Sequence, residues 1–147
     1  MVTKVKIGFK FVLVLVFLAS ASCGSTIEDR YIWKPLTVTA TAYNSTSAQT
    51  FGDPFIAAWG DSLSVEIPSI AISRNLLQLG LKRDTPVKID GFDGIFLVRD
   101  KMHSKWKNRI DIYMGTDIQK ARQWGRRKLT IRYGVPKDSV KVDSAVK

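Results

Sequence analysis

The chain has 147 residues, a formal net charge of +10, 45% hydrophobic residues and a single cysteine. This length leaves room for one domain with a modest core, and the apolar fraction excludes an intrinsically disordered protein. A single cysteine excludes an intramolecular disulfide. The excess of basic residues suits an acidic partner, and a solvated basic surface without a partner stays open as the alternative.

Residues 1–22 have the layout of a secretory signal. Three lysines, Lys4, Lys6 and Lys10, precede the apolar run Phe11–Ala19, and small residues follow it. A membrane-spanning helix needs about 18 consecutive apolar residues, which this run does not supply. We therefore predict an exported protein of the cell envelope.

Cys23 follows the small residues directly, a position that resembles the lipobox of bacterial lipoproteins. In that interpretation Cys23 is the lipidated first residue of the mature chain and anchors it to the outer membrane, on the periplasmic side. Cleavage after Ala21, which would release a free secreted protein, stays open as the alternative. Residues 23–35 are polar and aperiodic, and we interpret them as a tether.

From residue 36 onward the sequence is typical of short strands. The alternating or β-branched segments are Leu36–Tyr43, Leu63–Ile67, Ser69–Ile72, Pro86–Asp90, Gly94–Arg99, Arg109–Met114 and Leu129–Tyr133. A helical turn is expected after Ser73, and a short helix capped by Thr116 is expected to end at Gly125. No long crossover helix separates the strands, so the pattern predicts a mainly β domain, a small closed barrel over residues 36–134, with a polar tail over 135–147.

The segment from Arg99 to Asp111 is a polar loop with an aspartate at each end, Asp100 and Asp111. If the flanking strands are neighbours, both carboxylates lie at one end of the sheet. A second negative charge raises the pKa of the first carboxyl, which favours a proton donor for glycosidic cleavage. The alternative is that both aspartates cap turns or pair with basic neighbours, and their spacing does not decide between these interpretations.

Other residues of this segment suggest binding rather than further chemistry. The aromatic residues that could stack on sugar rings are Trp59, Trp106, Trp124, Tyr43 and Tyr113. Of these we expect Trp106 to stack on a sugar or to cover the barrel mouth, and we expect Lys101, Arg109 and Tyr113 to line the same substrate site. His103 is the sole histidine, so the sequence predicts no zinc site and no other cofactor. Nucleic acid is not expected as a partner, because no recognition-helix or zinc-finger spacing is present.

From Thr37 to Tyr133 the chain resembles the 3D domain, named for its aspartates and found in membrane-bound lytic transglycosylase A and in wall proteins of stationary phase and resuscitation. The matching motifs are TATAY at 39–43, IAIS-x3-L-x-LG at 70–80, PVKI-x2-F at 86–92, VRD-x10-DIYMG at 98–115 and A-x2-WG-x3-L-x-I at 121–131.

The resemblance implies a six-stranded double-psi β-barrel and a peptidoglycan substrate. It makes Asp111 the acid that cleaves the bond between MurNAc and GlcNAc with formation of a 1,6-anhydro ring, and Asp100 the aspartate that opens the loop. Two positions depart from the family pattern: Lys101-Met102-His103 replaces Thr-Gly-Gly, and Ser73 replaces a third aspartate. These departures motivate a second hypothesis, a wall-binding lipoprotein without the chemistry. A third, an anionic-lipid or partner-binding module, uses the basic loop 101–109.

Overall fold

The computed structural model describes residues 26–46 and 53–140. The predicted signal, the predicted lipidation site at Cys23, part of the loop after the first strand, and the end of the polar tail lie outside the described residues. None of the helices within the described ranges is both long and apolar enough to cross a membrane.

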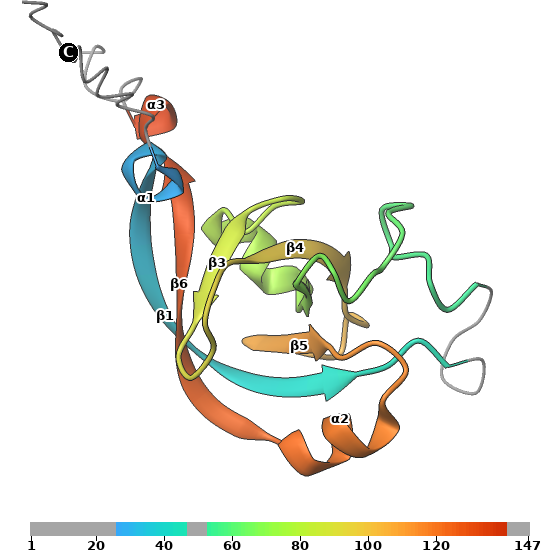
Figure 1. Cartoon of the computed structure of the whole chain (residues 1–147). Helices are drawn as coiled ribbons and strands as arrows, with labels where there is room; N and C mark the ends of the chain where they lie inside the picture. Colours follow the sequence, from blue (N-terminus) through green and yellow to red (C-terminus); the bar gives the residue numbers. More distant parts are fainter. Residues whose placement is uncertain (1–25, 47–52, 141–147) are drawn as a thin grey trace, which may run out of the picture.

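Six strands close into a barrel in the order β1-β5-β2-β4-β3-β6 (Figure 1). They are β1 Tyr31–Tyr43, β2 Ser69–Ile72, β3 Pro86–Ile89, β4 Phe96–Lys101, β5 Arg109–Tyr113 and β6 Arg127–Pro136. The helical elements are the short α1 Ile27–Arg30, the 3-10 helix η1 Arg74–Leu79, α2 Ile118–Trp124 and α3 Lys137–Val140. The predicted mainly β, six-stranded barrel with few short helices is confirmed.

The strand order has an internal two-fold relation. Pairs β1–β5 and β2–β4 are parallel, and the remaining neighbours are antiparallel. Advancing every strand by three positions (β1 to β4, β2 to β5, β3 to β6) reproduces the same ring and the same pair directions. Two parallel pairs related in this way are the arrangement of a double-psi β-barrel, as predicted.

The barrel interior is filled by one side of each strand, as strand alternation requires. On β5 the side chains of Ile110 and Ile112 are fully buried, whereas Asp111 between them is only half-buried. Further core side chains come from the other strands: Val38, Ala40, Ile70, Ile72, Val87, Val98 and Ile131. Asp111 therefore lies on the outer face of the barrel wall.

The first and last strands are longer than the sequence predicts. The register of β1 with β6 runs from Tyr31 paired with Pro136 inward to the barrel, so the two strands form a ribbon that extends past it. The expected tether thus ends at residue 30, and the expected tail contributes its first two residues to β6. Local patterning underestimated both strands because backbone pairing, rather than apolar alternation, holds this ribbon together.

Two smaller expectations were wrong. Residues Leu63–Ile67 form no strand, since a turn at residues 65–66 interrupts them, and this region contains a single bridge between Ile56 and Ser62. The cap of α2 is Asp117, whose side chain accepts a hydrogen bond from the backbone N–H of Lys120. A carboxylate at that position also complements the positive end of the helix dipole.

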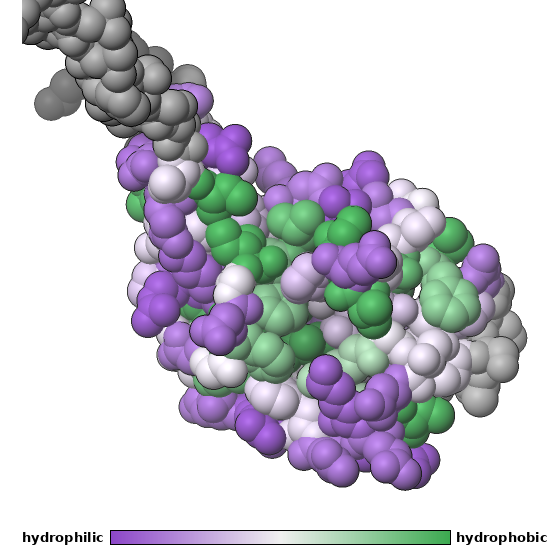
Figure 2. Space-filling model, in the orientation of Figure 1, coloured by the Kyte–Doolittle hydropathy of each residue, from purple (hydrophilic) through white to green (hydrophobic). Residues whose placement is uncertain are grey.

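Figure 2 shows hydrophilic side chains along the outer edge of the β1–β6 ribbon and hydrophobic ones gathered toward the middle of the same face. Several large apolar side chains are exposed, of which Val65 at 70% is the extreme. Phe55 and Ile56 are also exposed, and both belong to the loop 53–63 that borders the candidate site described next.

Candidate active site

Four side chains form one row across four adjacent strands. The register pairs Thr41 of β1 with Asp111 of β5, Asp111 with Ala71 of β2, and Ala71 with Asp100 of β4. The strands that carry the two aspartates are not neighbours, because β2 lies between them. Strand spacing therefore places the two aspartate Cα atoms roughly 10 Å apart, with only the methyl group of Ala71 between them.

A β-bulge in β4 gives Asp100 its orientation. Ile70 pairs with Val98, but the next residue of β2, Ala71, pairs with Asp100, so that Arg99 is the extra residue. Side chains alternate along a strand and Val98 is fully buried, so without the bulge Asp100 would face the core. The bulge instead places Asp100 on the outer face beside Asp111, a common use of bulges at functional sites.

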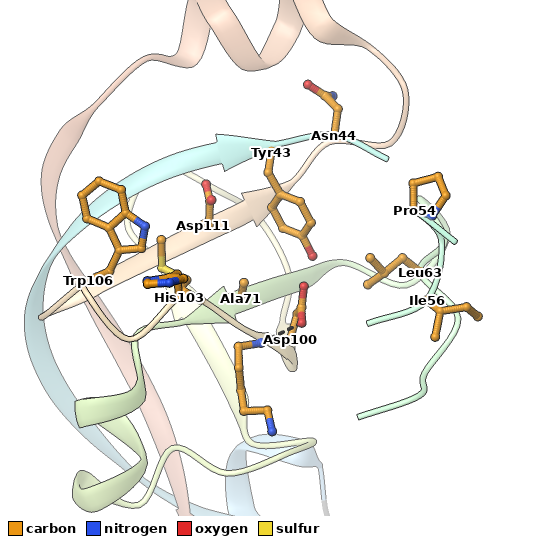
Figure 3. A pocket seen from close by; sticks show the side chains of 12 residues that line it. Tyr43, Asn44, Pro54, Ile56, Leu63, Ala71, Asp100, His103, Trp106 and Asp111 are labelled. Carbon is orange, nitrogen blue, oxygen red and sulfur yellow. Dashed lines mark hydrogen bonds between the residues drawn. The ribbon is translucent and has the colours of Figure 1, made fainter. Parts of the chain in front are cut away.

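A cavity of about 250 Å³ opens above this row (Figure 3). Loop residues 54–63 border it on one side and residues 102–106 on the other. The lining residues are Tyr43, Asn44, Pro54, Ile56, Leu63, Ala71, Asp100, Lys101, Met102, His103, Trp106 and Asp111. The structure therefore brings both predicted aspartates into one cavity.

Asp111 combines burial with a single strong hydrogen bond. The hydroxyl of Thr41 donates to Oδ1 of Asp111 at 2.8 Å. Burial raises the pKa of the Asp111 carboxyl to about 6, against the lowering effects of the Thr41 bond and the Arg109 charge, and the charge of Asp100 raises it further. A carboxyl with this pKa exchanges its proton near neutral pH, which suits a group that first donates and then accepts a proton.

Asp100 has a different environment. Its Oδ1 accepts hydrogen bonds from the backbone N–H groups of Ala58 and Lys101, both at 2.7 Å. Through Ala58 it fixes the loop that borders the cavity. The alternative that the aspartates serve the structure thus holds in part for Asp100, because it binds two backbone N–H groups. In the described part of the chain neither Asp100 nor Asp111 pairs with a basic side chain.

The bordering loop is held at its far end by a buried carboxylate. Asp61 accepts hydrogen bonds from the guanidinium groups of Arg83 and Arg99, and Arg99 also pairs with Asp84 at 2.7 Å. The hydrogen bond from Arg83, ahead of the charges of both arginines, lowers the pKa of Asp61. Arg99, the bulge residue, therefore binds the loop rather than the catalytic candidates.

Two of the four predicted binding residues line the cavity. The Lys101 ammonium lies 4.8 Å from the ring centroid of Trp59, and Trp106 contributes to the opposite wall. Arg109 is not a lining residue; its guanidinium stacks at 3.9 Å on the Trp106 ring and so orients it.

The expectation for Tyr113 was wrong. Its side chain is only 8% exposed and lies beneath the loop 53–63, where it packs against Tyr43 with ring centroids 5.3 Å apart. Its hydroxyl is bonded to Ser45 Oγ at 3.0 Å. Tyr113 shares the outer face with Asp111, as alternation predicts, but the loop covers that part of the face.

Tyr43, one of the aromatic residues that could stack on a sugar, lies two residues after Thr41 on the same face of β1, so strand alternation places it beside the site. Sequence reasoning missed several other lining residues. Met102 and His103 line the cavity where the resembled family has glycines. The contribution of Pro54, Ile56 and Leu63 had no local signal, because it depends on how the loop before β2 lies against β4 and β5, which come some 40 to 50 residues later in the chain. Among the described residues no three His, Cys, Asp or Glu side chains gather as a metal site.

No family model matches the chain, and no curated protein matches it. Among solved structures it is similar to an apo expansin of Clavibacter michiganensis, with 14% identity, 71% of this chain and 52% of that chain covered, and a TM-score of 0.47. A variant of the Clavibacter michiganensis expansin, in complex with cellohexaose, gives 14% identity, 69% and 50% coverage, and a TM-score of 0.43. The chain spans about half the length of these expansin chains. The barrel topology given above rests on the strand pairing of this chain itself.

Proposed function

We propose that this protein is an exported, peptidoglycan-active enzyme that cleaves the MurNAc–GlcNAc bond in the manner of a lytic transglycosylase. The observation that carries the proposal is the placement of Asp111, half-buried in a cavity with a second carboxyl group across a single alanine. The motif resemblance to the 3D domain supports the same assignment. In this proposal Cys23 holds the domain at the outer membrane through a lipid.

Asp111 acts first as an acid. In its protonated form it donates its proton to the oxygen that bridges the two sugars, and the bond between that oxygen and C1 of MurNAc breaks. The resulting oxocarbenium-like charge is stabilised by nearby negative charge, which Asp100 supplies. The GlcNAc end leaves with the proton as a free hydroxyl group.

Asp111 then acts as a base. Its carboxylate removes the proton from the 6-hydroxyl of the same MurNAc while that oxygen bonds to C1 and closes the 1,6-anhydro ring. No water is consumed, and Asp111 returns to its protonated state. Thr41 holds the carboxyl group in place throughout, because its hydroxyl donates to Oδ1.

The binding surface for the sugar chain includes one aromatic wall, Trp106, whose ring carries the Arg109 guanidinium. Lys101, which also lines the cavity, is held over the ring of Trp59. Flat aromatic faces suit the apolar faces of sugar rings, and each cation holds its ring in position.

The test is incubation of the purified mature protein with peptidoglycan sacculi, followed by mass spectrometry of the released muropeptides. Anhydro-muropeptides are expected from the native protein, and Asp111→Asn should reduce their release by roughly 10²- to 10⁴-fold. Asp93→Asn, at an exposed turn away from the cavity, is the matched control and should release them normally. Undiminished release by Asp111→Asn would overturn the assignment of the acid.

A second candidate function is glycan binding without cleavage. It is favoured by Met102 and His103, whose side chains occupy cavity wall where the resembled family has glycines. In that case the protein would sediment with sacculi and release no muropeptide fragments.

A further inference from the structure

Tyr43 ends β1 at the edge of the cavity, and its ring is held from several sides. It pairs in register with Tyr113 and packs in a small cluster with Ala57, Leu63 and Tyr113. The ring is therefore fixed by apolar contacts rather than by its own hydroxyl group. Figure 3 shows the hydroxyl end of the ring directed into the space above Ala71 and Asp100.

The hydroxyl group itself is buried and has no hydrogen-bond partner among the described residues. Leaving a buried hydroxyl unpaired is costly, by about 1–3 kcal/mol. The neighbouring Tyr113 shows the contrast, since its hydroxyl is bonded to Ser45. A polar atom held unpaired at a cavity that contains two carboxyl groups points to a partner supplied by a ligand.

The phenol stays protonated in this environment. Burial raises the pKa of Tyr43 strongly, and the negative charges of Asp100 and Asp111 raise it further. A neutral phenol offers one O–H donor. Its natural partner is an acceptor oxygen, of which a sugar chain carries many.

We propose that the Tyr43 hydroxyl is a substrate-binding group that donates a hydrogen bond to an oxygen of the sugar bound at Asp111. This inference rests on the proposed function in requiring a glycan ligand, but it does not require cleavage. It adds a neutral donor to a site whose other central groups, Asp100 and Asp111, are acidic.

The test compares Tyr43→Phe with Tyr113→Phe. Both changes remove one oxygen from one of two packed tyrosines, but only Tyr43 lines the cavity. Tyr43→Phe should weaken binding of soluble peptidoglycan glycan strands by about 10-fold, without lowering the melting temperature. Tyr113→Phe should lower the melting temperature by a few degrees, roughly as expected for one lost buried hydrogen bond, with little change in glycan affinity.

Binding is measured by titration calorimetry in the Asp111→Asn background, so that no strand is cleaved during the measurement. Equal affinity with and without the Tyr43 oxygen would overturn the inference, and so would a lower melting temperature of Tyr43→Phe, which indicates a partner within the chain. If Tyr43→Phe lowers the glycan affinity while the native protein releases no anhydro-muropeptides from sacculi, the inference is supported and cleavage is contradicted. Absence of any glycan binding by the native protein would overturn both proposals.

Discussion

At the residue scale, the behaviour of Asp111 follows from where strand alternation places it. Its neighbours Ile110 and Ile112 are fully buried in the core, so its own side chain lies on the outer face. That face is then partly closed by the loops around the cavity, and burial raises the carboxyl pKa to about 6. The Thr41 hydroxyl limits the rise because it stabilises the ionised form.

The raised pKa has a consequence for stability. A carboxyl whose folded pKa lies above its unfolded value binds more protons when folded, so its stabilising effect is complete below the unfolded pKa of 3.8 and is lost as pH rises through about 6. Asp111→Asn removes the titrating carboxyl group, so this variant does not lose the stabilisation as the pH rises. Relative to the native protein, the variant should therefore gain about 1–3 kcal/mol of unfolding free energy between pH 4 and pH 7.5.

Urea denaturation at the two pH values measures this difference. Asp93→Asn serves as the reference for changes unrelated to the cavity, because that side chain is exposed at a turn. An Asp111→Asn profile parallel to the native one from pH 4 to pH 7.5 would show that Asp111 titrates normally in the folded protein.

At the element scale, a buried polar network fixes the start of β5. The Ser73 hydroxyl is fully buried; its oxygen accepts the backbone N–H of Arg109 at 2.9 Å and its proton is donated to Asn75 Oδ1 at 2.9 Å. Asn75 also binds Asn108 twice: its side-chain amide donates to Asn108 Oδ1, and its Oδ1 accepts the backbone N–H of Asn108. Asn108 has a φ of 49°, a left-handed conformation that asparagine tolerates better than most residues. The network thus sets the turn that brings the chain into β5 and to Asp111.

The resemblance to the 3D domain leads one to expect an aspartate where this chain has Ser73, but the hydrogen bonds of Ser73 give it a structural role. Ser73→Ala leaves the Arg109 N–H without its partner and should cost about 1–3 kcal/mol of unfolding free energy. Ser104→Ala, at an exposed position in the following loop, is the matched control and should change stability little. Chemical denaturation compares them; equal stabilities of the two variants would contradict a structural role for the Ser73 hydroxyl.

At the scale of the whole molecule, the ring closes through the β1–β6 ribbon and its contact with β3. Gly134 of β6 lies where a Cβ atom would meet Pro86 Cγ at 2.8 Å and Tyr31 Cδ1 at 2.9 Å. The close approach joins β3 to both strands of the ribbon. This position needs glycine for lack of space rather than for an unusual backbone angle.

Gly134→Ala should therefore destabilise the barrel by about 1–3 kcal/mol, the usual cost of an added methyl group in a packed position. Removing one of the two obstacles should reduce that cost, so Gly134→Ala is expected to be milder in a Tyr31→Ala background. Thermal unfolding of the four proteins of this cycle measures the coupling. Additive effects would show that the methyl group does not press on Tyr31.

Much of the fold could be predicted from local pattern. Alternation located the strands at 36–43, 69–72, 86–90, 94–99, 109–114 and 129–133 within a few residues, and it placed Asp111 off the core face. Local pattern could not extend β1 to Tyr31 or β6 to Pro136, because those ends are held by pairing with each other. It also could not tell that Tyr113 is covered, since the covering loop lies about 50 residues earlier in the chain.

The sequence by itself determined the alternation that locates the six strands and singled out the two aspartates as candidates, because each follows from residue type and spacing within one segment; it also suggested a seventh strand, at 63–67, that does not form. The tertiary structure alone decided that the two aspartates line the same cavity. Their strands are separated by β2, and the bulge at Arg99 brings Asp100 into one row with Ala71 and Asp111. Strand order and register depend on contacts between distant segments, so the spacing of residues along the chain does not predict them.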